Sequence, residues 1–148
     1  MFEKMFDIVV LSGGFDPIHI GHTRMIIAAS KLGAEVFVGV NSDEWLKRKK
    51  GYAFMPWSER AEMAESIKGV TRAISFDDSD NSACNLIRKV RAENPNVSIA
   101  FANGGDRNKA NIPENDIAKD LGIALVWSIG GGKIQSSSDL VKKIKEKE

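Results

Sequence analysis

The chain has few of the residues that mark disulfide-stapled or metal-rich proteins, and it has no long apolar run. Its single cysteine, Cys84, excludes an internal disulfide and suits a reducing compartment. Its two histidines, His19 and His22, are too few for the three or four ligands of a zinc site, so we predict no protein-bound metal. No segment has the length of a membrane span or the charged flank of a signal peptide. We therefore expect a cytoplasmic protein with no membrane partner.

An excess of charge of either sign is also missing. Lysine and arginine number 21 against 20 aspartates and glutamates, which gives a net charge of +1. No global field therefore favours nucleic acid, and any anion site must be local. With 148 residues, 43% of them hydrophobic, the chain is long enough for one ordinary domain with a sizeable core, and we expect a single domain over residues 1–148.

Strand-like and helix-like segments alternate along the chain. Gly33 and Gly69 are expected to close the first two helices, and Pro95 breaks the third. The patterns predict strands over 6–12, 35–40, 70–76, 97–102 and 123–129, and helices over 22–32, 56–67, 81–93, 113–121 and 138–145. Such alternation predicts an α/β fold, a single doubly wound Rossmann-like domain with about five parallel strands.

Three segments follow carboxyl ends of predicted strands. We expect them to lie on one rim of the sheet, together with the turn that follows the first strand. They are two long loops, 41–55 and 104–112, and the glycine turn 130–132. The first turn itself, Gly13 to His22, carries glycines and both histidines between a strand and a helix. Ligands bind beyond the carboxyl ends of parallel strands, and a helix N-terminus favours phosphate. The rim is therefore the predicted active site, and the imidazoles are predicted phosphate donors.

Other phosphate motifs do not fit. Phe15 and Ile18 break the G-x-G-x-x-G spacing, and Trp127 and Ile134 break a P-loop around Lys133.

The turn His19-Ile20-Gly21-His22, preceded by Gly14-Phe15-Asp16, resembles the H-x-G-H signature of the cytidylyltransferase-like nucleotidyltransferase superfamily. Further blocks are similar to bacterial sugar-phosphate adenylyltransferases of the heptose type, and much of the pattern is shared with glycerol-phosphate cytidylyltransferases. These blocks are Val40–Asp43, Lys47–Gly51, Pro56 with Glu59-Arg60, Gly104–Asp106 and Ser136–Ser138. The chain departs from the heptose type at Asn103, where that family has lysine, and it lacks the arginine that precedes Ser136 in the glycerol-phosphate type.

The resemblance implies an enzyme that transfers a nucleoside monophosphate from a nucleoside triphosphate to a small phosphorylated acceptor and releases pyrophosphate. AMP is favoured over CMP, a sugar or polyol phosphate is the expected acceptor, Mg²⁺ accompanies the triphosphate, and a homodimer is common in such families. The implied catalytic residues are His19, His22 and Lys47. The implied nucleotide-binding residues are Gly13, Gly14, Phe15, Asp16, Gly21, Gly105, Asp106, Ser136, Ser137 and Ser138.

Other interpretations stay open at this point. The chain could be a nucleotide-binding regulator without chemistry, or an adenylyltransferase of the pantetheine-phosphate or nicotinamide-mononucleotide type. A tRNA synthetase fragment shares the signature but would need an anticodon-binding domain. Some residues also have simpler structural roles: Lys47 to Lys50 as a solvated loop, Asp106 as a turn residue, and Ser136 to Ser138 as a helix cap.

Overall fold

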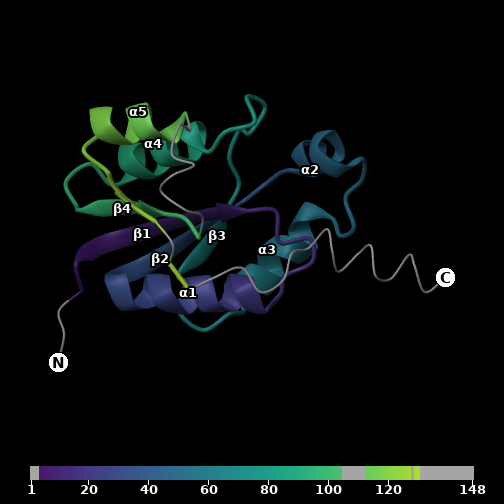
Figure 1. The fold of residues 1–148 in the computed structure, drawn as a ribbon, viewed down its shortest axis with the longest axis horizontal. Helices are drawn as coiled ribbons and strands as arrows, with labels where there is room; N and C mark the ends of the chain where they lie inside the picture. Colours follow the sequence, from purple (N-terminus) through teal and green to yellow (C-terminus); the bar gives the residue numbers. More distant parts are fainter. Residues whose placement is uncertain (1–3, 105–112, 128, 131–148) are drawn as a thin grey trace.

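The computed structural model describes residues 4–104, 113–127 and 129–130, and its centre is a five-stranded parallel sheet (Figure 1). The strands lie in the order β3-β2-β1-β4-β5. Their bounds are β1 Phe6–Gly13, β2 Gly33–Val40, β3 Arg72–Ile74, β4 Ile99–Ala102 and β5 Ala124–Val126. The doubly wound α/β fold predicted from the sequence is confirmed.

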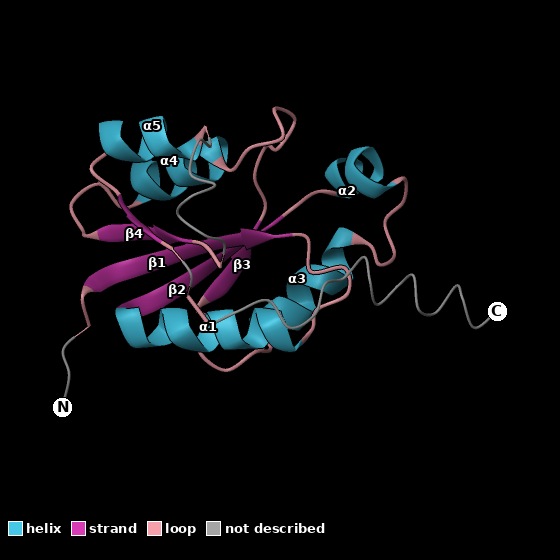
Figure 2. Cartoon of the chain, in the orientation of Figure 1, coloured by secondary structure: helices cyan, strands magenta, loops and turns pink. Residues whose placement is uncertain are grey.

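Helices cover both faces of the sheet, as Figure 2 shows. Helices α1 (Ile20–Leu32) and α3 (Trp57–Glu65) lie on one face, and α4 (Cys84–Glu93) and α5 (Glu114–Asp120) lie on the other. Strand residues alternate between two cores: Val9 and Leu11 pack toward α1, while Ile8 and Val10 pack toward α4. Within the described residues, no helix combines the length and apolar character needed to cross a bilayer.

The strand order places a switch point at the centre of the sheet. From β1 the chain crosses to β2 and β3 on one side, and then returns to β4 on the other side of β1. The crossovers on either side of β1 therefore run in opposite directions, which opens a crevice beyond the carboxyl ends of β1 and β4. The turn Gly13 to His22 leaves β1 at this crevice.

The segment 41–55, predicted to be a loop, contains a helix, α2 (Asp43–Lys50), which lies beyond the carboxyl end of the sheet (Figure 1). Ser42 caps it by accepting a hydrogen bond from the Trp45 amide at 3.0 Å. Its first turn is acidic, its last turn is basic, and Gly51 ends it with a φ of 89°. These local signals stabilise the helix. The apolar period that would have predicted it is missing, because Leu46 is its one buried residue.

Other boundaries differ by a few residues from the prediction. Helix α1 begins at Ile20 rather than His22, so His22 lies in its first turn. Asn81 to Ala83 lie outside α4, and the Ser82 amide and hydroxyl both donate to the Asp80 carboxylate at 2.9 Å. Gly33 does not close α1 with a left-handed turn: its φ is −125° and it begins β2. A Cβ there would lie 2.6 Å from Val9 Cγ2, so close packing requires the glycine.

Candidate active site

Both histidine side chains accept hydrogen bonds from backbone amides at the first turn of α1. The Gly21 amide donates to His19 Nδ1 at 3.1 Å, and the His19 amide donates to His22 Nδ1 at 3.1 Å. The amides of His22 and Thr23 donate to the His19 carbonyl oxygen. The backbone N–H groups that usually serve an anion at a helix N-terminus are thus largely used within the turn.

This arrangement fixes the tautomer of both imidazoles. A ring nitrogen that accepts a hydrogen bond carries no proton, so each neutral ring must carry its proton on Nε2. In this turn both rings accept through Nδ1, so Nε2–H is the donor of each neutral ring. The helix terminus therefore carries two imidazole N–H donors where a row of amides usually serves an anion.

The local environment keeps His22 uncharged. Burial first, and the neighbouring His19 second, lowers the pKa of His22 to about 4. The two rings stack with centroids 3.9 Å apart, a spacing at which two imidazolium charges would repel each other. His22 is therefore a neutral hydrogen-bond donor at physiological pH.

The Phe15 side chain packs against the His22 ring. Its side chain is 2% exposed, and its ring meets the His22 ring edge-on with centroids 4.7 Å apart. Its φ of 53° is uncommon for a bulky residue and turns the ring back under the strand end. The imidazole is thus held by a backbone hydrogen bond on one side and an aromatic wall on another.

Asp16 holds the turn to the segment after α2 rather than facing the crevice. Its two carboxylate oxygens accept from the amides of Phe54 at 2.6 Å and Met55 at 2.7 Å. Lys50 Nζ lies 3.2 Å from one of these oxygens and donates to the Asp16 carbonyl at 2.8 Å. The carboxylate is 1% exposed, so its charge is balanced inside the protein.

Arg60 of α3 joins three loops from beneath the site. Its side chain is fully buried and donates to the carbonyl oxygens of Gly14 at 2.8 Å, Asn41 at 2.7 Å and Met55 at 2.9 Å. It also forms an ion pair with Asp43 at the start of α2. A guanidinium suits this position because its donors form a rigid planar fork.

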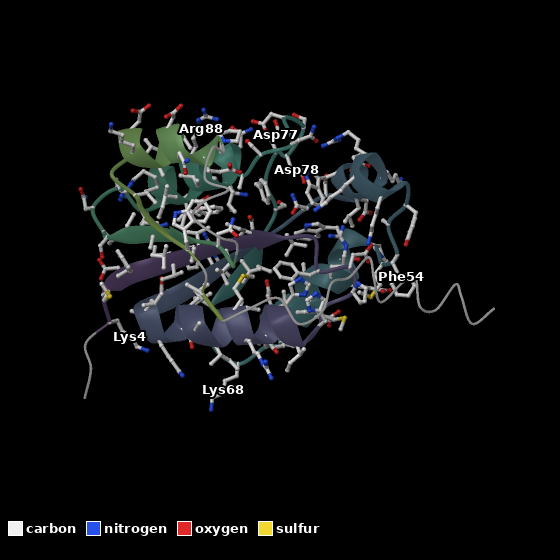
Figure 3. The ribbon with its side chains drawn as sticks, viewed as in Figure 1. Lys4, Phe54, Lys68, Asp77, Asp78 and Arg88 are labelled. Carbon is white, nitrogen blue, oxygen red and sulfur yellow. The ribbon has the colours of Figure 1, made fainter. Side chains whose placement is uncertain are left out.

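A second buried charge, Asp78, fixes the start of α2. Its carboxylate accepts from the Asn41 side chain, the Ser42 amide and the Ser42 hydroxyl, at 2.7 to 3.1 Å. Figure 3 shows Asp78 on the loop after β3, on the side where α2 lies, whereas Phe54 lies at the other end of α2's segment. Arg48 donates to the Asp78 carbonyl and completes the link between this loop and α2.

The structure therefore brings together one part of the predicted set. Gly13, Gly14, Phe15, Asp16, His19, Gly21 and His22 lie in a single strand-to-helix turn. Lys47 lies on α2 rather than on a loop, and its side chain is exposed. Gly105, Asp106, Ser136, Ser137 and Ser138 lie outside the described residues.

Three contributors were not predicted from the sequence: Arg60, Asp78 and Lys50 as the partner of Asp16. Asp78 stands in a segment rich in polar residues, 77–82, where nothing marks one carboxylate as buried. No group of three or more potential metal-ligating side chains occurs among the described residues.

Comparison with known proteins shows which family the chain belongs to. The family model described as cytidylyltransferase-like matches residues 10–146, nearly the whole chain. The chain belongs to the cytidylyltransferase-like family. Among its relatives in this family, the bifunctional protein HldE of Nitratiruptor sp. is 33% identical over 116 residues, which cover 77% of this chain and 23% of the relative.

Other similarities are shorter or concern the fold alone. A bifunctional phosphopantetheine adenylyltransferase/NTP phosphatase of Thermoplasma volcanium is 40% identical over 53 residues, 36% of this chain and 16% of the relative. A bifunctional NMN adenylyltransferase/ADP ribose pyrophosphatase of Francisella tularensis has a TM-score of 0.72 at 17% identity, covering 97% of this chain and 43% of that one. The chain spans about a quarter of the length of the HldE proteins it matches.

Proposed function

We propose that this cytidylyltransferase-like chain is a single nucleotidyltransferase domain. It transfers a nucleoside monophosphate, AMP in preference to CMP, from a nucleoside triphosphate to a small phosphorylated acceptor such as a sugar or polyol phosphate. An oxygen of the acceptor phosphate attacks the α-phosphorus in line, the bond from the α-phosphorus to the bridging oxygen breaks, and pyrophosphate leaves.

The observation that carries the proposal is the pair of imidazoles with both Nδ1 atoms engaged. These bonds hold both rings, and the lowered pKa of His22 keeps that ring neutral, at the end of the central strand where the sheet has its switch point. Fixed donors at such a place stabilise the charge that builds on phosphate oxygens in the transition state. His19 and His22 therefore serve as the catalytic donors.

The other predicted residues have one of two proposed roles: they form the turn around the triphosphate, or they contact its phosphates and nucleoside. Gly13, Gly14, Phe15, Asp16 and Gly21 form the turn that receives the triphosphate, with Asp16 and Phe15 acting on its shape. Lys47 is the lysine that we propose reaches the phosphates from α2. Gly105, Asp106 and Ser136 to Ser138 are proposed nucleotide contacts on the basis of the family resemblance.

We propose Mg²⁺ as the accompanying ion. Both oxygens of Asp16, the one carboxylate in the turn, accept amide hydrogen bonds, so the turn itself suits a metal that arrives with the triphosphate rather than a resident ion. When bound, Mg²⁺ would neutralise phosphate charge while keeping most of its other ligands as water and phosphate oxygen. The buried free thiol of Cys84 suits a cytoplasmic location, which we propose for the protein. We also propose a homodimer, as the family resemblance implies.

The test is pyrophosphate release with Mg²⁺ and each of ATP, CTP, GTP and UTP, against glycerol 3-phosphate, sugar 1-phosphates, phosphopantetheine and nicotinamide mononucleotide. Product formation is followed in parallel by ³¹P NMR, which detects the new diphosphate linkage. Turnover with a sugar or polyol phosphate is the expected result. Triphosphate binding by calorimetry without turnover on any acceptor would favour a regulator instead.

A second candidate, an adenylyltransferase of the pantetheine-phosphate or nicotinamide-mononucleotide type, is favoured by two of the similarities above. A sequence relative and a solved structure carry those activities in their names. Exclusive turnover with phosphopantetheine or nicotinamide mononucleotide in the same panel would establish it and overturn the sugar-phosphate assignment.

A further inference from the structure

A pocket of about 250 Å³ opens at the carboxyl ends of β2 and β3, and β2 pairs with the strand from which the histidine turn leaves. We propose that this pocket binds the hydroxyl-bearing, uncharged part of the acceptor, and so selects a polyol or sugar phosphate. The proposal rests on the proposed transferase function. The lining residues are Val40, Ser42, Asp43, Glu44, Trp57, Ser75 and Phe76.

The pocket is next to the proposed phosphate site. Val40 on its wall is the register partner of Gly13 across the β1–β2 pair, and the Asn41 amide donates to the Gly13 carbonyl at 2.9 Å. Neighbouring strands are roughly 5 Å apart. In the proposed binding mode, the phosphate of the acceptor lies at the histidine turn and its remaining atoms lie in the pocket.

The chemistry of the lining fits hydroxyl groups and does not fit a phosphate. Among the described residues that line the pocket there is no lysine, arginine or histidine, whereas there are two carboxylates, Asp43 and Glu44. Asp43 and Glu44 also place negative charge at the N-terminus of α2, which offsets the attraction of that terminus for anions. Carboxylates accept hydrogen bonds from hydroxyl groups, and charged acceptors of this kind form the stronger bonds.

The apolar part of the lining is held in place. The Trp57 indole donates through Nε1 to the Val40 carbonyl at 2.9 Å, which fixes the ring at the base of the pocket. Asp43 is fixed by its ion pair with the buried Arg60. Trp57 and Phe76 can pack against C–H groups of a polyol while Glu44 and Ser75 receive its hydroxyls. The combination of fixed apolar walls and a few polar groups is typical of a small-molecule site.

Two substitutions test the pocket, each with a matched control. Glu44→Gln removes the charge of an exposed acid in the first turn of α2, and Glu59→Gln does the same in the first turn of α3, outside the pocket. Ser75→Phe fills the pocket from an exposed position, and Ser58→Phe places the same ring on the exposed surface of α3.

Two pairs of probes separate hydroxyl recognition from phosphate recognition. Glycerol 3-phosphate is compared with propyl phosphate, and mannose 1-phosphate with cyclohexyl phosphate, with pyrophosphate release measured for each. We expect the hydroxyl-bearing member of at least one pair to be favoured about tenfold or more in kcat/KM. Glu44→Gln and Ser75→Phe should remove most of this preference without changing the calorimetric Kd for the triphosphate, and both controls should retain it.

An activity-independent measurement keeps the two proposals distinguishable. The Trp57 indole N–H resonance is followed by NMR while each probe is added in the presence of a non-hydrolysable triphosphate. Saturable shifts with a hydroxyl-bearing probe and not with its partner support the pocket even if transfer is absent, in which case the proposed function alone fails. Transfer with no Trp57 shift, or with equal preference in the wild type and both pocket variants, overturns the pocket assignment.

Discussion

The turn after β1 and the segment after β2 leave adjacent strands at the same edge of the sheet, yet they are built differently. The turn packs its aromatic and imidazole rings against one another, and the amides of His19 and Gly21 donate to imidazole nitrogens within it. The α2 segment buries one apolar side chain, Leu46, and exposes most of its charged ones. Adjacent strand ends thus carry one preorganised element and one that is held mainly by polar links.

The links to α2 come from outside it. Arg60 bonds Asp43, Asp78 bonds the Ser42 cap, and Asp16 bonds both Lys50 and the chain after it. The position of α2 relative to the histidines therefore depends on a few buried charges. Removing them should affect α2 before it affects the turn.

The largest effect is expected from Arg60→Met. It leaves three carbonyls and Asp43 without their shared donor, and breaking a buried ion pair costs about 3–5 kcal/mol of unfolding free energy. Urea denaturation measures the loss. Arg72→Met is the control, because Arg72 and its partner Glu93 are both nearly half exposed and such pairs contribute below about 1 kcal/mol. Equal losses for the two variants would contradict the role of Arg60.

The next effect is on turnover, through the turn itself. His22→Asn keeps an acceptor for the His19 amide but has no counterpart of Nε2–H, so it separates the cap from the proposed chemistry. Losing one transition-state donor should lower kcat about a hundredfold, or about 3 kcal/mol. His19→Asn should behave in the same way. Circular dichroism and the urea midpoint check that the fold is kept; near-normal turnover would remove the histidines from the mechanism.

Much of the difference between the turn after β1 and the α2 segment could be predicted from the sequence. Glycines, histidines and a preceding apolar strand occur within a few residues, so the turn after β1 and its chemistry were predicted from local pattern. Five alternating strand and helix patterns were enough to predict the sheet. The helix α2 was missed because its apolar period is absent, although the Ser42 cap, its acidic first turn and Gly51 were all readable.

The buried charges could not be predicted from local pattern. Arg60 lies in an ordinary amphipathic helix, where an arginine is expected to face solvent. It is buried because the chain brings Gly14, Asn41 and Met55 to one point, and those residues are separated in sequence. Asp78 is similar, since its partners Asn41 and Ser42 lie more than 30 residues earlier. Long-range topology decides which charges are buried.

Stability should depend on pH through His22. The pKa of His22 is lowered from 6.5 to about 4, so the unfolded chain binds a proton below pH 6.5 that the folded chain does not. The free energy of unfolding should therefore fall by up to about 3 kcal/mol as the pH falls from 6.5 to 4. The difference in unfolding free energy between the wild type and His22→Asn, measured at pH 7 and pH 4, isolates it. A difference that does not change with pH would show that His22 titrates normally.

The smallest effects distinguish two of the three lysines of α2, Lys47 and Lys50. Lys50→Met leaves the buried Asp16 without its counter-charge and should cost about 2 kcal/mol of unfolding free energy. Lys47 is exposed, so Lys47→Met should change stability by less than about 0.5 kcal/mol while lowering kcat about tenfold if it reaches the phosphates. Urea denaturation and pyrophosphate release are measured on both variants. If Lys47→Met has full activity and Lys50→Met lowers turnover well beyond its loss of folded protein, the phosphate-binding lysine of α2 is Lys50, and Asp16 then holds it in place beside the histidine turn.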